Sequence, residues 1–102
     1  MDYQRILSGQ EKPLTIYKAV ATALESPRSF PDLVEPIYRE AMTLDDETLD
    51  RFRFSLMRLQ IYADIHRNED LEQAMHIRYV AQVIEKVVFG SLIMEPAEPL
   101  AD

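Results

Sequence analysis

The chain has 102 residues, of which 47% are hydrophobic and none is cysteine, and its 18 acidic and 11 basic residues give a net charge of −7. The length predicts a single domain, the apolar fraction excludes disorder for most of the chain, and the lack of cysteine excludes disulfides and thiol chemistry. Because the sequence has no apolar run long enough to span a membrane and no signal-peptide pattern, we expect a soluble, cytoplasmic protein that does not contact membranes.

Glycine and proline divide the N-terminal part of the chain. Residues 2–8 predict a short helix that Gly9 ends. Pro13 suits the first position of a second helix, where its missing N–H costs nothing. That helix is expected to stop at residues 26–27, because the residue before a proline is pushed out of the helical region.

A third helix is expected to begin near residues 31–32, with Ser29 as its N-cap. Pro36 fixes this start, because a proline is tolerated only within about the first turn of a helix. A kink at Pro36 is the alternative.

Neither glycine nor proline occurs from Ile37 to Phe89, which favours long helices over strands and turns. Thr43 or Asp45 is expected to cap a fourth helix at its N-terminus. A core-facing row of this helix has coiled-coil-like spacing and consists of Leu49, Phe52, Leu56, Leu59, Ala63 and His66. A second apolar row flanks it and consists of Phe54, Met57, Ile61 and Ile65.

Asp70 and Gln73 form a plausible capping pair for a fifth helix with a broad apolar face. Residues 87–94 are open between a continued helix and a very short hairpin, and residues 95–102 predict a disordered acidic tail. The fold class is therefore all-α: a small bundle of about five helices in one domain, residues 1–94, with two long, antiparallel C-terminal helices.

The sequence has few candidates for catalysis or metal binding. His66 and His76 lie near several acids, but their spacing matches neither a zinc-protease motif nor a di-iron bundle motif. Most serines occupy expected caps and breaks, and two glycines cannot make a phosphate-binding loop. We therefore expect a non-enzymatic protein without a metal or a cofactor.

Nucleic-acid binding is also disfavoured, although five arginines gather in the second half of the chain. They are Arg51, Arg53, Arg58, Arg67 and Arg78. Acids three or four residues before three of them predict intrahelical ion pairs on a solvated surface, namely Glu47–Arg51, Asp50–Arg53 and Asp64–Arg67.

The width of the apolar faces on the last two helices is the best functional lead. One packed face needs an apolar stripe of about 100°, so a wider one must be buried on two sides, either by the N-terminal helices or by a second chain. We expect a protein–protein interaction module that forms a homodimer and acts as an adaptor, regulator or inhibitor. The interface residues expected are Phe54, Met57, Ile61, Val87, Phe89, Leu92 and Ile93.

The negative charge is local. An acidic patch without any basic residue lies within residues 40–50 and consists of Glu40, Asp45, Asp46, Glu47 and Asp50. The remaining excess of acidic over basic residues comes from the tail, at Glu95, Glu98 and Asp102. The alternative function is an acidic mimic that blocks a basic, nucleic-acid-binding surface, or a weak nucleic-acid-binding regulator using the arginines.

Overall fold

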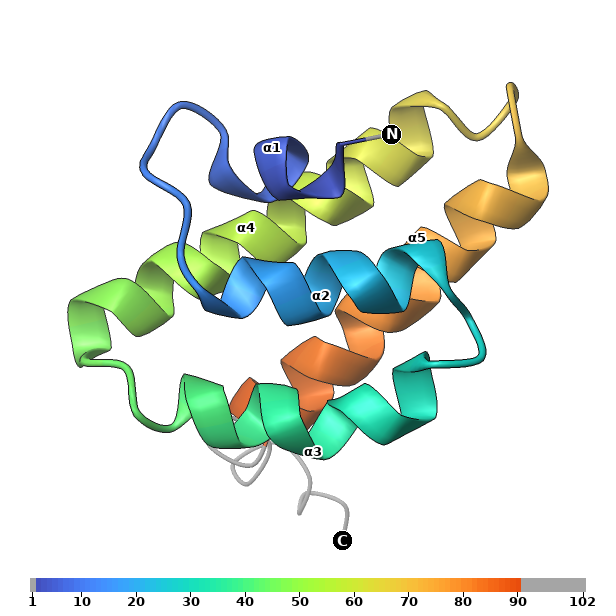
Figure 1. The fold of residues 1–102 in the computed structure, drawn as a ribbon. Helices are drawn as coiled ribbons and strands as arrows, with labels where there is room; N and C mark the ends of the chain where they lie inside the picture. The colour runs from blue at the N-terminus through green and yellow to red at the C-terminus, as the bar shows by residue number, and fades with distance from the viewer. Residues whose placement is uncertain (1, 91–102) are drawn as a thin grey trace, which may run out of the picture.

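The computed structural model describes residues 2–90, and over this range it is an all-α bundle without strands (Figure 1). Its helices are α1 (Tyr3–Ser8), α2 (Ile16–Glu25), α3 (Phe30–Ala41), α4 (Asp46–Ile65) and α5 (Leu71–Glu85), and α5 runs directly into a π-helical turn, η1 (Lys86–Gly90). The predicted fold class is confirmed. None of the described helices combines the length and apolarity needed to cross a membrane.

The two long helices, α4 and α5, form an antiparallel pair. Asp64 bonds Arg78 near one end of the pair, whereas Phe52 packs against Phe89 near the other. Helix α1 packs on α4, α2 bridges α1, α3 and α5, and α3 contacts α5 and η1. Figure 1 shows α1 and α2 on the near side of the α4–α5 pair.

The core lies where these helices meet. Its largest fully buried side chains come from α1, α2, α3, α4 and α5 together with η1: Tyr17, Phe52, Leu7, Ile16, Ile37, Leu56, Leu59, Ile77, Ile84, Val20, Val80 and Val88. The central residues of the first apolar row of α4, from Phe52 to Ala63, are thus in the core as the heptad-like spacing predicted.

Helix boundaries follow local capping chemistry in most places. The side chains of Asp2, Asp45 and Asp70 each accept a hydrogen bond from the backbone N–H three residues on. Gly9 ends α1 at φ +62°, a conformation that favours glycine. Its position also faces the guanidinium of Arg58, which donates to the Leu7 carbonyl at 2.8 Å.

Three predicted details of the first helices differ from the structure. Helix α2 starts at Ile16 rather than directly after Pro13, because a single turn comes first, closed by the bond from Tyr17 N to Leu14 O. Ser29 stands at the N-cap position of α3 as predicted, but its side chain makes no capping bond and its hydroxyl bonds that of Ser26 instead.

Pro36 lies inside α3, beyond the first turn to which we expected it to be confined. The N–H that proline lacks would have bonded the carbonyl of Asp32. Asp32 is exposed rather than buried, and the helix continues past Pro36 to Ala41.

Candidate interaction surface

Helix α4 carries a second apolar row that no described helix covers. Phe54, Met57, Ile61 and Ile65 are between 46% and 69% exposed. They follow one another at three or four residues, which places them on one face of the helix. The sequence left two possible covers for this row, the N-terminal helices or a second chain. In the part of the chain that the structure describes, the N-terminal helices do not cover it.

Helix α5 adds exposed apolar side chains on the side that meets α4, because Leu71 and Met75 lie seven and three residues before Arg78, which bonds Asp64 of α4. Leu71 and Met75 lie one turn apart and are 57% and 60% exposed. Tyr79 is similarly exposed, but its ring packs edge-on against Phe30 of α3. The surface that results is called here the outer face, and its residues are Phe54, Met57, Ile61, Ile65, Leu71 and Met75.

Polar bridges between α4 and α5 hold the two halves of the outer face together. Arg78 donates to Asp64 at 2.7 Å, and Gln60 donates to Glu85 at 3.4 Å. Arg53 forms an ion pair with the same Glu85 at 3.7 Å. On α4, Arg53, Gln60 and Asp64 each directly precede a residue of the exposed apolar row. The apolar side chains therefore flank the line along which α4 and α5 meet.

A groove of about 300 Å³ opens at one end of the outer face. It is lined by Asp50, Arg53, Phe54 and Met57. The Arg53 guanidinium lies 5.1 Å from the centre of the Phe89 ring, a cation–π distance, while its Nε approaches Glu85. The groove is therefore lined by two apolar and two charged side chains, and of the charged ones Arg53 is held by contacts with α5 and η1.

Of the other predicted interface residues, the two that the structure describes, Val87 and Phe89, do not belong to the outer face. Phe89 is only 4% exposed and packs against Phe52, with 6.3 Å between ring centres, so it belongs to the core. Val87 is half-buried, and Leu92 and Ile93 are outside the described residues. The alternative of a hairpin is contradicted for its first arm, because residues 87–90 are helical.

The predicted arginine pairs are replaced by contacts with parts of the chain that are distant in sequence. Arg51 bonds Glu11 at 2.7 Å and also the Lys12 carbonyl, and Arg53 and Asp64 bond residues of α5 as described above. Arg58 bonds the Leu7 carbonyl and Ser55. Four of the five arginines thus have partners within the fold, which leaves little support for a nucleic-acid surface.

The acidic patch lies where α3 passes into α4. Asp45 caps α4, and its bond from Thr48 holds the pKa of the carboxyl below its usual range. None of the five patch members, Asp45 included, forms an ion pair with a described residue. The patch therefore presents uncompensated negative charge beside the groove, to which Asp50 also belongs.

The two histidines do not form a metal site. His66 bonds Glu69 at 2.9 Å, whereas His76 bonds the Ala23 carbonyl of α2 at 3.1 Å. Within residues 2–90, no group of three or more histidine, cysteine or acidic side chains is placed to hold a metal ion.

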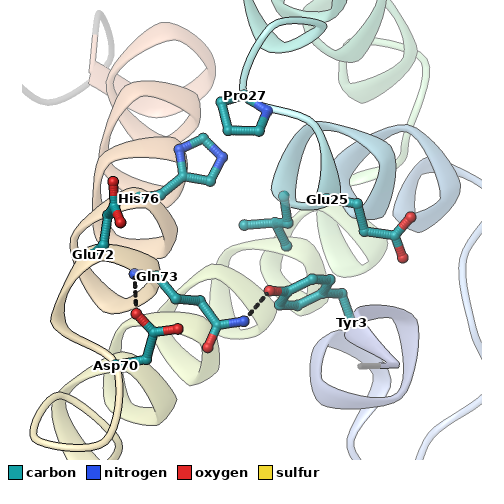
Figure 2. A pocket seen from close by; sticks show the side chains of 8 residues that line it. Tyr3, Glu25, Pro27, Asp70, Glu72, Gln73 and His76 are labelled. Atoms are coloured by element: carbon teal, nitrogen blue, oxygen red, sulfur yellow. Dashed lines mark hydrogen bonds between the residues drawn. The ribbon is translucent and has the colours of Figure 1, made fainter.

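A second pocket, of about 500 Å³, opens where α1, α2 and α5 meet (Figure 2). Its residues are Tyr3, Leu24, Glu25, Pro27, Asp70, Glu72, Gln73 and His76. The Gln73 side chain donates to the Tyr3 hydroxyl at 2.8 Å and so does not complete the capping pair expected with Asp70. Burial raises the pKa of Tyr3, against the lowering effect of that hydrogen bond. No serine, threonine or cysteine lines the pocket, so His76 has no hydroxyl or thiol of these residues to activate there.

Sequence reasoning found the α4 half of the outer face and missed the α5 half. The spacing of four between Leu71 and Met75 was the available signal, but Leu71 lies at the start of the helix and two residues alone do not define an apolar row. No protein-family model matches the chain, and the searches of curated proteins and of solved structures returned no match.

Proposed function

We propose that the chain is a non-enzymatic protein–protein interaction module that self-associates through the outer face and acts as an adaptor, regulator or inhibitor. The exposed apolar row of α4 supports this function, because large side chains grouped on one face of a small domain mark interaction sites. A domain of this size also gains more from hiding such a surface than a larger one does.

The order of residues on α4 favours a second copy as the partner. Met57 lies between Phe54 and Ile61, so this part of the apolar row reads similarly in both directions. If two α4 helices pack antiparallel across a two-fold axis beside Met57, Phe54 of each copy lies opposite Ile61 of the other. Such a self-complementary patch is what a symmetric dimer requires.

A matched pair of substitutions tests this proposal. Met57 and Met42 are both 46% exposed, but Met42 caps α3 and lies off the outer face. Met57→Asp places a charge in the proposed dimer core and is expected to weaken the dimer at least about 30-fold. Met42→Asp is expected to leave it unchanged. Analytical ultracentrifugation across micromolar concentrations measures both, and a native chain that stays monomeric at tens of micromolar contradicts self-association.

The unpaired acids of the acidic patch favour a second candidate function, the acidic mimic. Binding of the chain to a lysine-rich peptide is expected to weaken steeply between low and physiological salt, because separate surface charges are screened by salt. Neutralising the patch with Asp46→Asn, Glu47→Gln and Asp50→Asn is expected to abolish this binding. An affinity that does not change with salt contradicts the mimic.

A further inference from the structure

The exposed row of α4 continues at its N-terminal end into the acidic patch. Glu47 and Asp50 precede Phe54 by seven and four residues, which places them on the same face of the helix as the apolar row. Both are exposed, and neither forms an ion pair with a described residue. Asp50 also lines the groove beside Phe54 and Met57. This end of the outer face is therefore negatively charged and hollowed.

The opposite end of α4 carries a positive charge without an ion-pair partner. Ile65 ends the apolar row and, at 69%, is its most exposed member. Arg67 follows two residues later, is exposed, and forms no ion pair with a described residue. The three acids nearest to it in the sequence already form hydrogen bonds within the fold, namely Asp64, Glu69 and Asp70. The charge of Arg67 is therefore free to act outside its own chain.

We propose that Arg67 of each copy binds Asp50 of the other copy in the dimer, and that these two ion pairs fix the α4 helices antiparallel across the groove. The inference rests on the proposed function, since it describes the same interface in more detail. It gives Asp50 a role in the homodimer that requires no separate basic partner.

The proposed two-fold axis brings these residues together. With Phe54 of one copy opposite Ile61 of the other, the residues four positions further from the axis are Asp50 and Ile65. Ile65 of the second copy therefore faces the groove, to whose lining Asp50 belongs. Arg67 lies only two residues beyond Ile65, about 3 Å at the helical rise, so its long side chain can reach the Asp50 carboxylate.

Charge favours the antiparallel orientation over a parallel one. In a parallel pair, the Asp50 carboxylates of the two copies would lie side by side, as would the two Arg67 side chains, and like charges across an interface repel. In the antiparallel pair, each end of the interface joins opposite charges. Ion pairs beside an apolar seam set the orientation of paired helices in coiled coils in the same way.

A mixture of two charge-reversed variants tests the contact. Asp50→Arg and Arg67→Glu each place like charges at both ends of the proposed interface, so each variant alone is expected to dimerise about tenfold more weakly than the native chain. A heterodimer of the two variants has opposite charges at both ends. In an equimolar mixture, its affinity is expected to lie within about threefold of that of the native dimer. Analytical ultracentrifugation of the separate and mixed variants measures these affinities.

Arg28→Glu is the matched control. Arg28 is exposed, lies between α2 and α3, and forms no ion pair with a described residue, so its reversal is expected to leave the dimer unchanged. Variants that dimerise as tightly as the native chain, or a mixture that dimerises no more tightly than its two components, overturn the ion pair and leave self-association intact. A native chain that stays monomeric at tens of micromolar overturns both.

Discussion

At the scale of single residues, the fold depends on one buried polar contact that joins α4 to α2. Ser55 is fully buried, and its hydroxyl donates to the Arg51 carbonyl at 3.0 Å. The buried Tyr17 hydroxyl then donates to Ser55 at 2.5 Å, and Arg58 donates to it at 3.3 Å. A serine inside a helix without a motif gave no signal of this role, because its partner Tyr17 is 38 residues away.

Removing the Ser55 hydroxyl is predicted to lower the free energy of unfolding more than removing the Tyr17 hydroxyl. Ser55→Ala leaves the Tyr17 hydroxyl buried without a partner, so the free energy of unfolding should fall by about 1–3 kcal/mol. Tyr17→Phe leaves Ser55 bonded to Arg51, and the loss should be about 0.5–1.5 kcal/mol. Urea denaturation measures both.

The double variant provides the control for this prediction. With both hydroxyls gone, no unsatisfied group remains, so its loss should be smaller than the sum of the two single losses. Additive losses would show that the two hydroxyls do not interact.

At the scale of helices, the features that could be predicted from the sequence are those that depend on residues close together in the chain. The caps at Asp45 and Asp70 were predictable because each bonds a backbone N–H only three residues away. The partners of Arg51 and Asp64 were not, because they depend on which helices pack together. Glu11 is 40 residues from Arg51, and Arg78 is 14 residues from Asp64.

Phe89 was assigned to the interface for a similar reason. An ideal α-helix places Val88 on the face of Ile84 and turns Phe89 away from it. The π-helical turn over residues 86–90 contains about one more residue per turn, so Phe89 comes round to the core as well. The sequence does not reveal this change of helical repeat, and Phe89 was placed in the interface because of the breadth of the apolar face.

The cap at Asp45 predicts a pH dependence of stability. Its hydrogen bond favours the charged carboxylate, so the pKa is lower in the folded state than in the unfolded state. Its contribution is therefore fully present above the unfolded pKa of about 4 and is lost as the pH falls through the lower, folded pKa. Asp45→Ala should lower the Tm at pH 7, and its deficit relative to the native chain should shrink towards pH 2.

Asp46→Ala is the control for this experiment. Asp46 also lies in the first turn of α4 but makes no capping bond, so its effect on the Tm should be smaller at pH 7. Circular dichroism melts at both pH values measure these differences. A Tm deficit of Asp45→Ala that is the same at pH 7 and pH 2 would contradict a role for the ionised carboxylate.

At the scale of the whole molecule, α4 has apolar residues on two faces, one in the core and one exposed. Phe52 and its row build the core against the other helices, while Phe54 and its row point away from every described helix. Two neighbouring phenylalanines on one helix thus belong to different surfaces. The period of the sequence predicted both rows, but only the packing of α1, α2 and α3 shows which row remains uncovered.

This division predicts how unfolding depends on protein concentration. If the native chain dimerises, its denaturation midpoint should rise with protein concentration, because association stabilises the folded state by mass action. Phe54→Ala should remove this dependence while changing monomer stability by no more than about 0.5 kcal/mol, since its side chain is exposed. Phe89→Ala should cost about 3–5 kcal/mol at every concentration and keep the dependence, since Phe89 belongs to the core. If the two variants behave alike, the separation of α4 into a core face and an outer face does not describe the protein in solution.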